Sequence, residues 1–205
     1  MTIHATTRAT FLGLAALALA ACSKKENYAA DSTAASSTTA GDTSAMAGAA
    51  SSTSTSGNWS DANIVALLDE ANAADSTAGS VAATKGTAAA VRDFGRRMMK
   101  DHHMLRAQGA ALAKKLNVTP SAPSDDPVPG MAQNETNTLN TTAKGKDFDK
   151  AYIDAEVDAH KAVLDLATKA AAQTQNAELK NLIQKAAPVI QGHLDKAESI
   201  QKTLK

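Results

Sequence analysis

The sequence predicts an all-α protein in which four long amphipathic helices form one bundle, with a long connection between the second and the third helix. Apolar residues recur at intervals of three and four through four segments of the chain, which is typical of helices that face a core. Aromatic residues make up only 3% of the chain. Small aliphatic side chains must therefore build the core, which favours closely packed helices over a sheet sandwich. No segment shows the alternation expected of a strand.

The charges exclude one class of partner. The chain has 205 residues, with 21 Lys and Arg against 21 Asp and Glu. A net charge of zero gives no electrostatic reason to expect a nucleic-acid partner, and the sequence indicates no particular protein partner. The length suits one domain with an appendage, and the single cysteine excludes a disulfide within the chain.

Residues 1–21 have the features of a lipoprotein signal peptide. Arg8 precedes an apolar run, Phe11 to Ala21, that is too short to span a bilayer but suits a secretory signal. The run ends in Leu19-Ala20-Ala21-Cys22, which is similar to the bacterial lipobox, where cleavage precedes a cysteine that receives a lipid. The sequence therefore predicts an exported chain anchored to the membrane through Cys22. Ser23 favours the outer membrane, facing the periplasm, if the host is Gram-negative.

Residues 22–58 consist mainly of Ser, Thr, Ala and Gly. Such a composition cannot bury enough apolar surface to offset the entropy lost on ordering, so we expect a disordered tether with a reach of about 30 Å. Residues 59–205 then form the helical bundle domain.

The first helix is predicted to begin at Trp59-Ser60-Asp61, with Ser60 as its N-terminal cap, and to end at Lys85. Gly86 is expected to give the chain a left-handed exit, and Thr87 to cap the second helix. Because this link is so short, the two helices are expected to form an antiparallel hairpin.

The second helix is predicted over residues 88–116, with a seam of small and apolar residues at Val91, Gly95, Met98, Leu105, Gly109, Leu112 and Leu116. Four prolines within residues 117–130 predict an irregular segment, and Met131 to Lys144 predicts only a short, weak helix. A connection of this length can cross the bundle. The second and third long helices are therefore expected to run parallel, as in ferritin-like bundles with one long crossover.

The third long helix is predicted to start after Gly145 with Asp147 as its cap, and to end near Thr174. Asn176 is predicted to cap the fourth, which continues to the end of the chain.

Polar residues interrupt the apolar seams near the middle of all four long helices: Asp75, His102, Glu156 with His160, and His193. Different helices would thus deliver three imidazoles and two carboxylates to one level of the bundle, which is how metal sites in helical bundles are built. Imidazole with carboxylate suits iron, zinc, manganese or copper, and these five residues are the predicted metal ligands.

Three interpretations of this cluster are open. The first is structural: a buried, hydrogen-bonded cluster in which Asp75 and Glu156 pair with the imidazoles and fix the helix register. The second is a metal site, either mononuclear or with a loosely bound metal. A ferritin-type di-iron centre is disfavoured, because Met99 and Ile190 stand where that pattern places a Glu three residues before a His. The third is an enzyme, a metal-dependent oxidase or peroxide-handling protein that uses the same residues.

Neighbouring residues receive separate predictions. Asp101 cannot face the same way as His102, so it is expected to pair with a basic group or to orient a histidine on another helix. His103 is expected to be solvated. Methionines near His102 are interpreted as core residues rather than copper ligands. Nothing in the chain matches a nucleophile with its base or a cofactor fingerprint.

The folded part of the chain also resembles a known family, on the motifs Val91-Arg92-Asp93-Phe94 leading into Met98 and Asp101-His102, then Phe148-Asp149, Tyr152 and His160, and finally Pro188 and His193-Leu194. The resemblance covers residues 58–205 and is to the bacterial family called domain of unknown function 4142. It implies a ferritin-like four-helix bundle in an exported, often lipid-anchored protein, with Glu common where this chain has Asp75. The family has no settled activity. The sequence thus predicts a lipid-anchored envelope protein, with stress tolerance as one interpretation of its role.

Overall fold

The computed structural model describes residues 58–204, all of which belong to one compact unit. The predicted signal peptide, Cys22 and the tether up to residue 57 lie outside these residues. Five helices and no strand occur in the described part: α1 (Asp61–Lys85), α2 (Ala89–Leu116), α3 (Val128–Thr141), α4 (Lys146–Gln173) and α5 (Ala177–Gln201). None of these helices is both long enough and apolar enough to cross a membrane.

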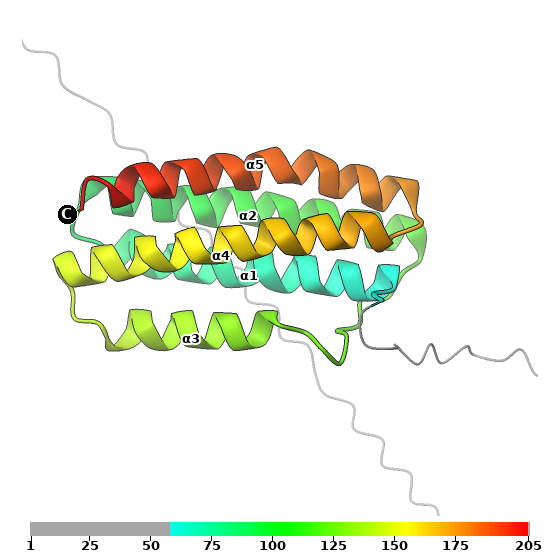
Figure 1. Ribbon diagram of the computed structural model, residues 1–205, viewed down its shortest axis with the longest axis horizontal. Helices are drawn as coiled ribbons and strands as arrows, with labels where there is room; N and C mark the ends of the chain where they lie inside the picture. Colours follow the sequence, from blue (N-terminus) through cyan, green and yellow to red (C-terminus); the bar gives the residue numbers. More distant parts are fainter. Residues whose placement is uncertain (1–57, 205) are drawn as a thin grey trace, which may run out of the picture. The chain divides into compact units, whose positions relative to one another are not determined.

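The helices form one bundle with the expected connectivity (Figure 1). α1 and α2 make an antiparallel hairpin, and α4 and α5 make a second one. α2 and α4 run in the same direction, so residues 117–145 cross the length of the bundle between them. The predicted all-α fold and its long connection are confirmed.

Two predicted helix caps are confirmed. The Ser60 side chain accepts a hydrogen bond from the Asn63 amide, and the Asn63 side chain accepts one from the Ser60 amide, which together form a capping box. At α5 the Asn176 side chain accepts hydrogen bonds from the amides of Glu178 and Leu179. Both caps follow from the local sequence alone.

The predicted left-handed exit at Gly86 is wrong, because its φ is −57°. This glycine is required for a different reason. A Cβ at this position would lie 2.6 Å from the carbonyl oxygen of Ala82, closer than atoms can approach. The tight link between α1 and α2 therefore depends on the small size of Gly86 and not on a positive φ.

The predicted cap of α2 by Thr87 is also wrong. The N-cap is Ala88, without a side-chain capping hydrogen bond, and the carboxylate of Asp149 in α4 instead holds the two residues that precede the helix. It accepts hydrogen bonds from the amides of Thr87 and Ala88, at 2.8 and 2.7 Å, and from the Thr87 hydroxyl. A residue about 60 positions away thus fixes the chain just before this helix, so no local pattern could have revealed it.

Helix boundaries in the long connection differ from the prediction as well. α3 begins at Val128, three residues earlier than expected, because Pro129 lies in its first turn, where a missing amide hydrogen costs nothing. At the start of α4 the N-cap is Gly145 without a side-chain hydrogen bond, so the predicted cap by Asp147 is wrong. α3 is a real fifth helix that packs against α1 and α4.

α1 and α2 approach each other unusually closely at two glycines. A Cβ on Gly79 would lie 2.7 Å from the carbonyl oxygen of Gly95, and one on Gly95 would lie 2.6 Å from that of Gly79. The two backbones are therefore in contact there, and only glycine fits at either position. This contact fixes the register of the hairpin that carries part of the site.

The core consists of two apolar clusters. One is built around Phe94, Met98, Phe148 and Tyr152, and the other around Ile64, Leu67, Leu179 and Ile183. Along each long helix, residues of one cluster lie before a polar residue and residues of the other lie after it. We call the residues between the clusters the polar layer; its members, which come from all five helices, are Asp75, His102, Glu135, Glu156, His160 and His193.

Candidate metal centre

Three histidines from three helices meet in the polar layer. His102 lies on α2, His160 on α4 and His193 on α5, and their exposed fractions are 1%, 0% and 0%. The ring centroids are 5.7 Å apart for His102 and His160, 5.2 Å for His102 and His193, and 5.5 Å for His160 and His193. We call these residues the histidine triad.

A side chain on α1 fixes the proton of His102. Its Nδ1 lies 2.8 Å from the amide oxygen of Asn72, whose own NH₂ group donates to the carbonyl of Leu68. Because the Asn72 NH₂ group donates to the Leu68 carbonyl, the Asn72 amide oxygen is the atom that faces the His102 ring, and it can act only as an acceptor. Nδ1 of His102 therefore carries the hydrogen, and Nε2 keeps its lone pair.

The other two rings are held in the same way. His160 Nδ1 donates to the backbone carbonyl of Glu156 at 2.8 Å, one turn earlier in α4. His193 Nε2 donates to a carboxylate oxygen of Asp101 at 3.0 Å, and Arg97 holds the same carboxylate from the outside. The prediction that Asp101 pairs with a basic group or orients a histidine on another helix is confirmed in both respects.

The three outward hydrogen bonds leave three inward lone pairs. The nitrogens without a hydrogen-bond partner among the described residues are Nε2 of His102, Nε2 of His160 and Nδ1 of His193. One potential ligand atom from each ring lies within 4.8 Å of the other two. Three neutral imidazole nitrogens that face one another cannot donate to each other, so only a cation or an outside donor satisfies them.

The environment keeps the triad uncharged and hence able to bind a cation. Burial, and after it the neighbouring His160 and His193, lower the pKa of His102 to about 3. Burial likewise lowers the pKa of His160 to about 4. It also lowers the pKa of His193, against the opposing effect of Asp101. Metals bind neutral imidazole, so no proton has to leave the triad near neutral pH.

Carboxyl groups occupy the other side of the polar layer. Asp75 of α1 and Glu156 of α4 are buried, with exposed fractions of 3% and 0%, and Glu135 of α3 is half-buried beside them. Burial raises the pKa of Asp75 to about 8 and that of Glu135 to about 7. The pKa of Glu156 also lies well above its usual range, first because of burial and then because of Asp75 and Glu135. We call these three residues the carboxyl cluster.

All five predicted ligands are brought to one level of the bundle, but not into a single group. Two sets have ligand atoms within 4.8 Å of one another: the histidine triad, and Asp75 with Glu156 and His160. His160 belongs to both sets. His103, predicted to be solvated, is exposed.

The hydrogen-bond pattern differs from the structural interpretation. In that interpretation Asp75 and Glu156 pair with the imidazoles. Asp75 lies 3.5 Å from His102 Nδ1, and the Glu156 carboxyl lies 3.3 Å from His160 Nδ1. The hydrogen bonds of these two nitrogens go instead to Asn72 and to the Glu156 backbone. Both carboxyl oxygens of Glu156 have no hydrogen-bond partner among the described residues.

Two residues of the site were missed from the sequence. Asn72 lies beside the apolar seam of α1, so it passes for a surface residue. Glu135 lies seven residues after Val128 and four before Leu139, both buried on the inner face of α3. This helical spacing places Glu135 on the side of α3 that faces the bundle. It is informative only if residues 128–141 form a helix, which the sequence predicts only weakly.

The fold and the site together define the class: an all-α bundle with three converging imidazoles in its centre. The chain belongs to the family described as a domain of unknown function, DUF4142, whose profile matches residues 43–200. This confirms the family resemblance. No curated protein matches the chain in sequence.

Two solved structures are similar to the bundle. CopM in the Cu(II)-bound form superimposes with a TM-score of 0.58 at 12% sequence identity, covering 72% of this chain and 99% of that one. CopM in the Cu(I)-bound form gives a TM-score of 0.56 at 12% identity, covering 71% and 97%. At this identity the comparison shows a shared helical-bundle fold.

Proposed function

We propose that this protein binds one copper ion through the histidine triad and thereby holds copper at the cell envelope. The observation that carries the proposal is the direction of the three imidazole protons. Each proton is held outward by a separate acceptor, so the three remaining lone pairs face one another in a buried space. Outward acceptors that orient histidines in this way are typical of metal centres.

The spacing of the triad suits a single ion. Three nitrogens placed about 2.0 Å from one ion in a plane lie about 3.5 Å from one another. The ligand atoms of the triad lie within 4.8 Å of one another, so small side-chain rotations bring all three to bonding distance.

Copper fits the donor set better than the other metals considered. Imidazole suits zinc, copper and iron, whereas manganese prefers oxygen ligands. Three neutral nitrogens with no carboxylate in the set suit Cu(I), which accepts low coordination numbers. The fold shared with CopM, a protein solved in Cu(I)- and Cu(II)-bound forms, supports the same choice.

Metal analysis of the full-length protein tests the proposal. The parent protein, with which all variants are compared, carries the substitution Cys22→Ser, because a free thiolate also binds Cu(I). After anaerobic loading with Cu(I) and removal of excess metal, we expect one copper per chain, measured by mass spectrometry. The matched control His103→Ala removes an exposed imidazole next to the triad and should keep its copper. The double variant His102→Ala, His160→Ala should lose it.

Two results would contradict the proposal: a parent that retains no copper, or a double variant that retains as much as the parent. Circular dichroism of each variant establishes that the bundle has formed. A folded double variant without copper separates loss of the ligands from loss of the fold.

We further propose that the chain is a lipoprotein attached through Cys22, with the bundle as a ferritin-like domain on a tether. The sequence Leu19-Ala20-Ala21-Cys22 supports the anchor, and Ser23 supports the outer membrane, facing the periplasm, in a Gram-negative host. The intact mass of the mature protein tests this: it should begin at Cys22 and carry acyl chains. Cys22→Ser should abolish both, and a mature protein without lipid would contradict the proposal.

A further inference from the structure

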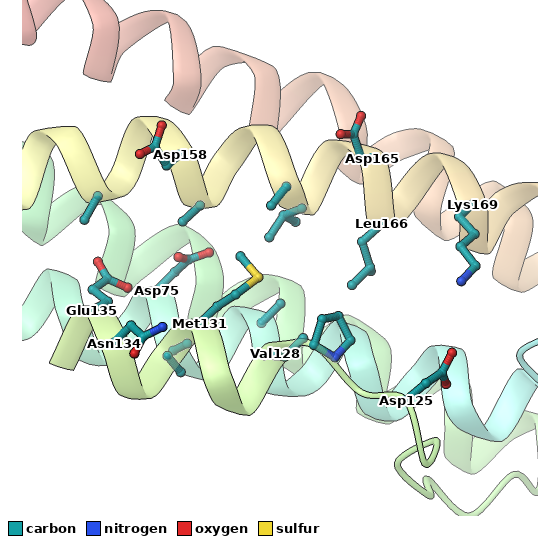
Figure 2. A pocket seen from close by; sticks show the side chains of 18 of the residues that line it. Asp75, Asp125, Val128, Met131, Asn134, Glu135, Asp158, Asp165, Leu166 and Lys169 are labelled. Carbon is teal, nitrogen blue, oxygen red and sulfur yellow. The ribbon is translucent and has the colours of Figure 1, made fainter. Parts of the chain in front are cut away.

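A large cavity opens between α1, α3 and α4 (Figure 2). Its volume is about 840 Å³, and alanines from all three helices form much of its wall. Glu135 and Asp75 lie next to each other at one end of it, with their carboxyl groups close together. The cavity thus connects the solvent with the carboxyl side of the polar layer.

Several polar atoms next to Asp75 and Glu135 have no hydrogen bond of good geometry. Both carboxyl oxygens of Glu156, one of Glu135 and the hydroxyl of Tyr152 lack a hydrogen-bond partner among the described residues. Glu156 and Tyr152 are completely buried. A ligand atom of Glu156 lies within 4.8 Å of one from Asp75 and one from His160. The Tyr152 hydroxyl lies near enough to Glu156 to favour its ionised form, but buried polar groups without well-formed hydrogen bonds are costly, and here they are concentrated in one place.

No Lys or Arg side chain among residues 58–204 forms an ion pair with these carboxyl groups. Besides burial, Glu135 raises the pKa of Asp75. Besides burial, Asp75 and Glu135 raise the pKa of Glu156, and the Tyr152 hydroxyl opposes them. His160 is the adjacent imidazole, and its Nδ1 already donates to the Glu156 backbone. The structure therefore brings ligand atoms of Asp75, Glu156 and His160 within 4.8 Å of one another at a buried point, with the half-buried Glu135 beside them on the cavity wall.

We propose that the carboxyl cluster, Asp75, Glu135 and Glu156, is a second metal site, separate from the histidine triad, for a divalent cation that prefers oxygen ligands. The cation enters through the cavity between α1, α3 and α4. Carboxylate ligands suit manganese, magnesium and calcium, whereas the imidazoles of the triad suit softer metals. The two sides of the polar layer thus bind different classes of ion, and the second site does not depend on copper in the first.

α3 acquires a function in this arrangement. It is the shortest helix in the described part of the chain, and it contributes Glu135 to the polar layer. Without α3, the carboxyl cluster would contain only Asp75 and Glu156. The connection between α2 and α4 is therefore part of a binding site and more than a crossover.

Electron paramagnetic resonance with Mn²⁺ tests the second site, because the signal of free Mn²⁺ falls as the ion binds. The full-length Cys22→Ser protein is titrated with Mn²⁺ at neutral pH, both metal-free and loaded with Cu(I), which gives no signal. We expect one bound Mn²⁺ per chain. Glu135→Gln and Glu156→Gln should each weaken binding at least tenfold.

Two controls distinguish the outcomes. Asp158 lies on the wall of the same cavity, but its side chain is exposed and points away from Asp75 and Glu135 (Figure 2). Asp158→Asn should leave Mn²⁺ affinity within about twofold. The double variant His102→Ala, His193→Ala should also keep Mn²⁺, which separates this site from the triad and from the proposed copper function.

Three results would overturn the second site. One is the absence of Mn²⁺ binding at millimolar concentration. Another is equal weakening by Asp158→Asn and Glu135→Gln, which would indicate diffuse attraction to surface charge. The third is loss of Mn²⁺ only in the double histidine variant, which would place the ion in the triad.

Discussion

Replacing Asp101 with Asn changes the proton position in one ring of the triad while keeping the shape of the side chain. The Asp101 carboxylate can only accept, so it requires the hydrogen on Nε2 of His193, at 3.0 Å. Burial raises the pKa of Asp101, but hydrogen bonds from His193 and Arg97 outweigh it, so the net shift is downward and the group is ionised. An Asn side chain can turn its NH₂ group toward Nε2. The proton of His193 then moves to Nδ1, which faces the triad.

The expected loss of Cu(I) affinity in Asp101→Asn follows from the number of metal-binding lone pairs that the substitution removes. One of three inward nitrogens would have to give up a proton before it binds metal, and it would lose a charged hydrogen-bond partner. Loss of such an orienting group typically weakens metal binding by about 10- to 100-fold, which corresponds to about 1.4 to 2.7 kcal/mol. We expect Asp101→Asn to weaken Cu(I) binding within this range.

Competition with a chromophoric Cu(I) chelator measures the effect, in the full-length Cys22→Ser protein. Arg97→Gln is the matched control, because Arg97 holds the same carboxylate from the exposed side and its loss leaves the Asp101–His193 hydrogen bond in place. The Cu(I) affinity of Arg97→Gln should stay within about threefold of that of the parent protein. The reasoning is refuted if Asp101→Asn also binds Cu(I) within threefold of the parent, or if both variants weaken binding equally.

Three further predictions concern the free energy of unfolding in urea, measured on metal-free protein. The folded pKa of Asp75, about 8, lies above its unfolded value of 3.8, so its contribution to stability is present below about pH 4 and is lost as the pH rises through 8. Asp75→Asn should therefore reduce the fall in stability between pH 5 and 9, and an unchanged slope would contradict this. Gly95→Ala should destabilise by about 1 to 3 kcal/mol, because the new Cβ meets backbone atoms of Gly79 and Ala83 at 2.6 and 2.8 Å; Gly109→Ala, with nothing within 4 Å, should instead stabilise by about 0.5 to 1 kcal/mol. Asp149→Ala should cost about 1 to 2 kcal/mol, since it removes three hydrogen bonds that a buried carboxylate accepts from the residues just before α2, and a cost near zero would show that solvent replaces them.

The long helices and the members of the histidine triad could be predicted because their signals are local. A repeat of three and four residues fixes which side of a helix faces inward, and His102 and His193 occupy positions on that side. The caps Ser60 and Asn176 act within three residues of themselves. Each of these features depends on spacing within one element.

The features that were missed depend on contacts between elements. Asp149 of α4 holds the residues just before α2, and Asn72 of α1 orients His102 of α2. Glu135 lies on a helix rich in Asn and Thr, whose formation depends on packing against α1 and α4 rather than on helix propensity. The division of the polar layer into two donor sets also required three-dimensional distances. The enzyme interpretation of the cluster stays a prediction.

The central claim is that three imidazole nitrogens converge on one copper ion. X-ray absorption at the copper edge, on the full-length Cys22→Ser protein loaded with one equivalent of Cu(I), tests it most directly. The account predicts three nitrogen ligands at about 2.0 Å with the outer-shell scattering of imidazole rings, and no sulfur ligand. Sulfur scattering, or a first shell without imidazole, would place the copper elsewhere and contradict the claim.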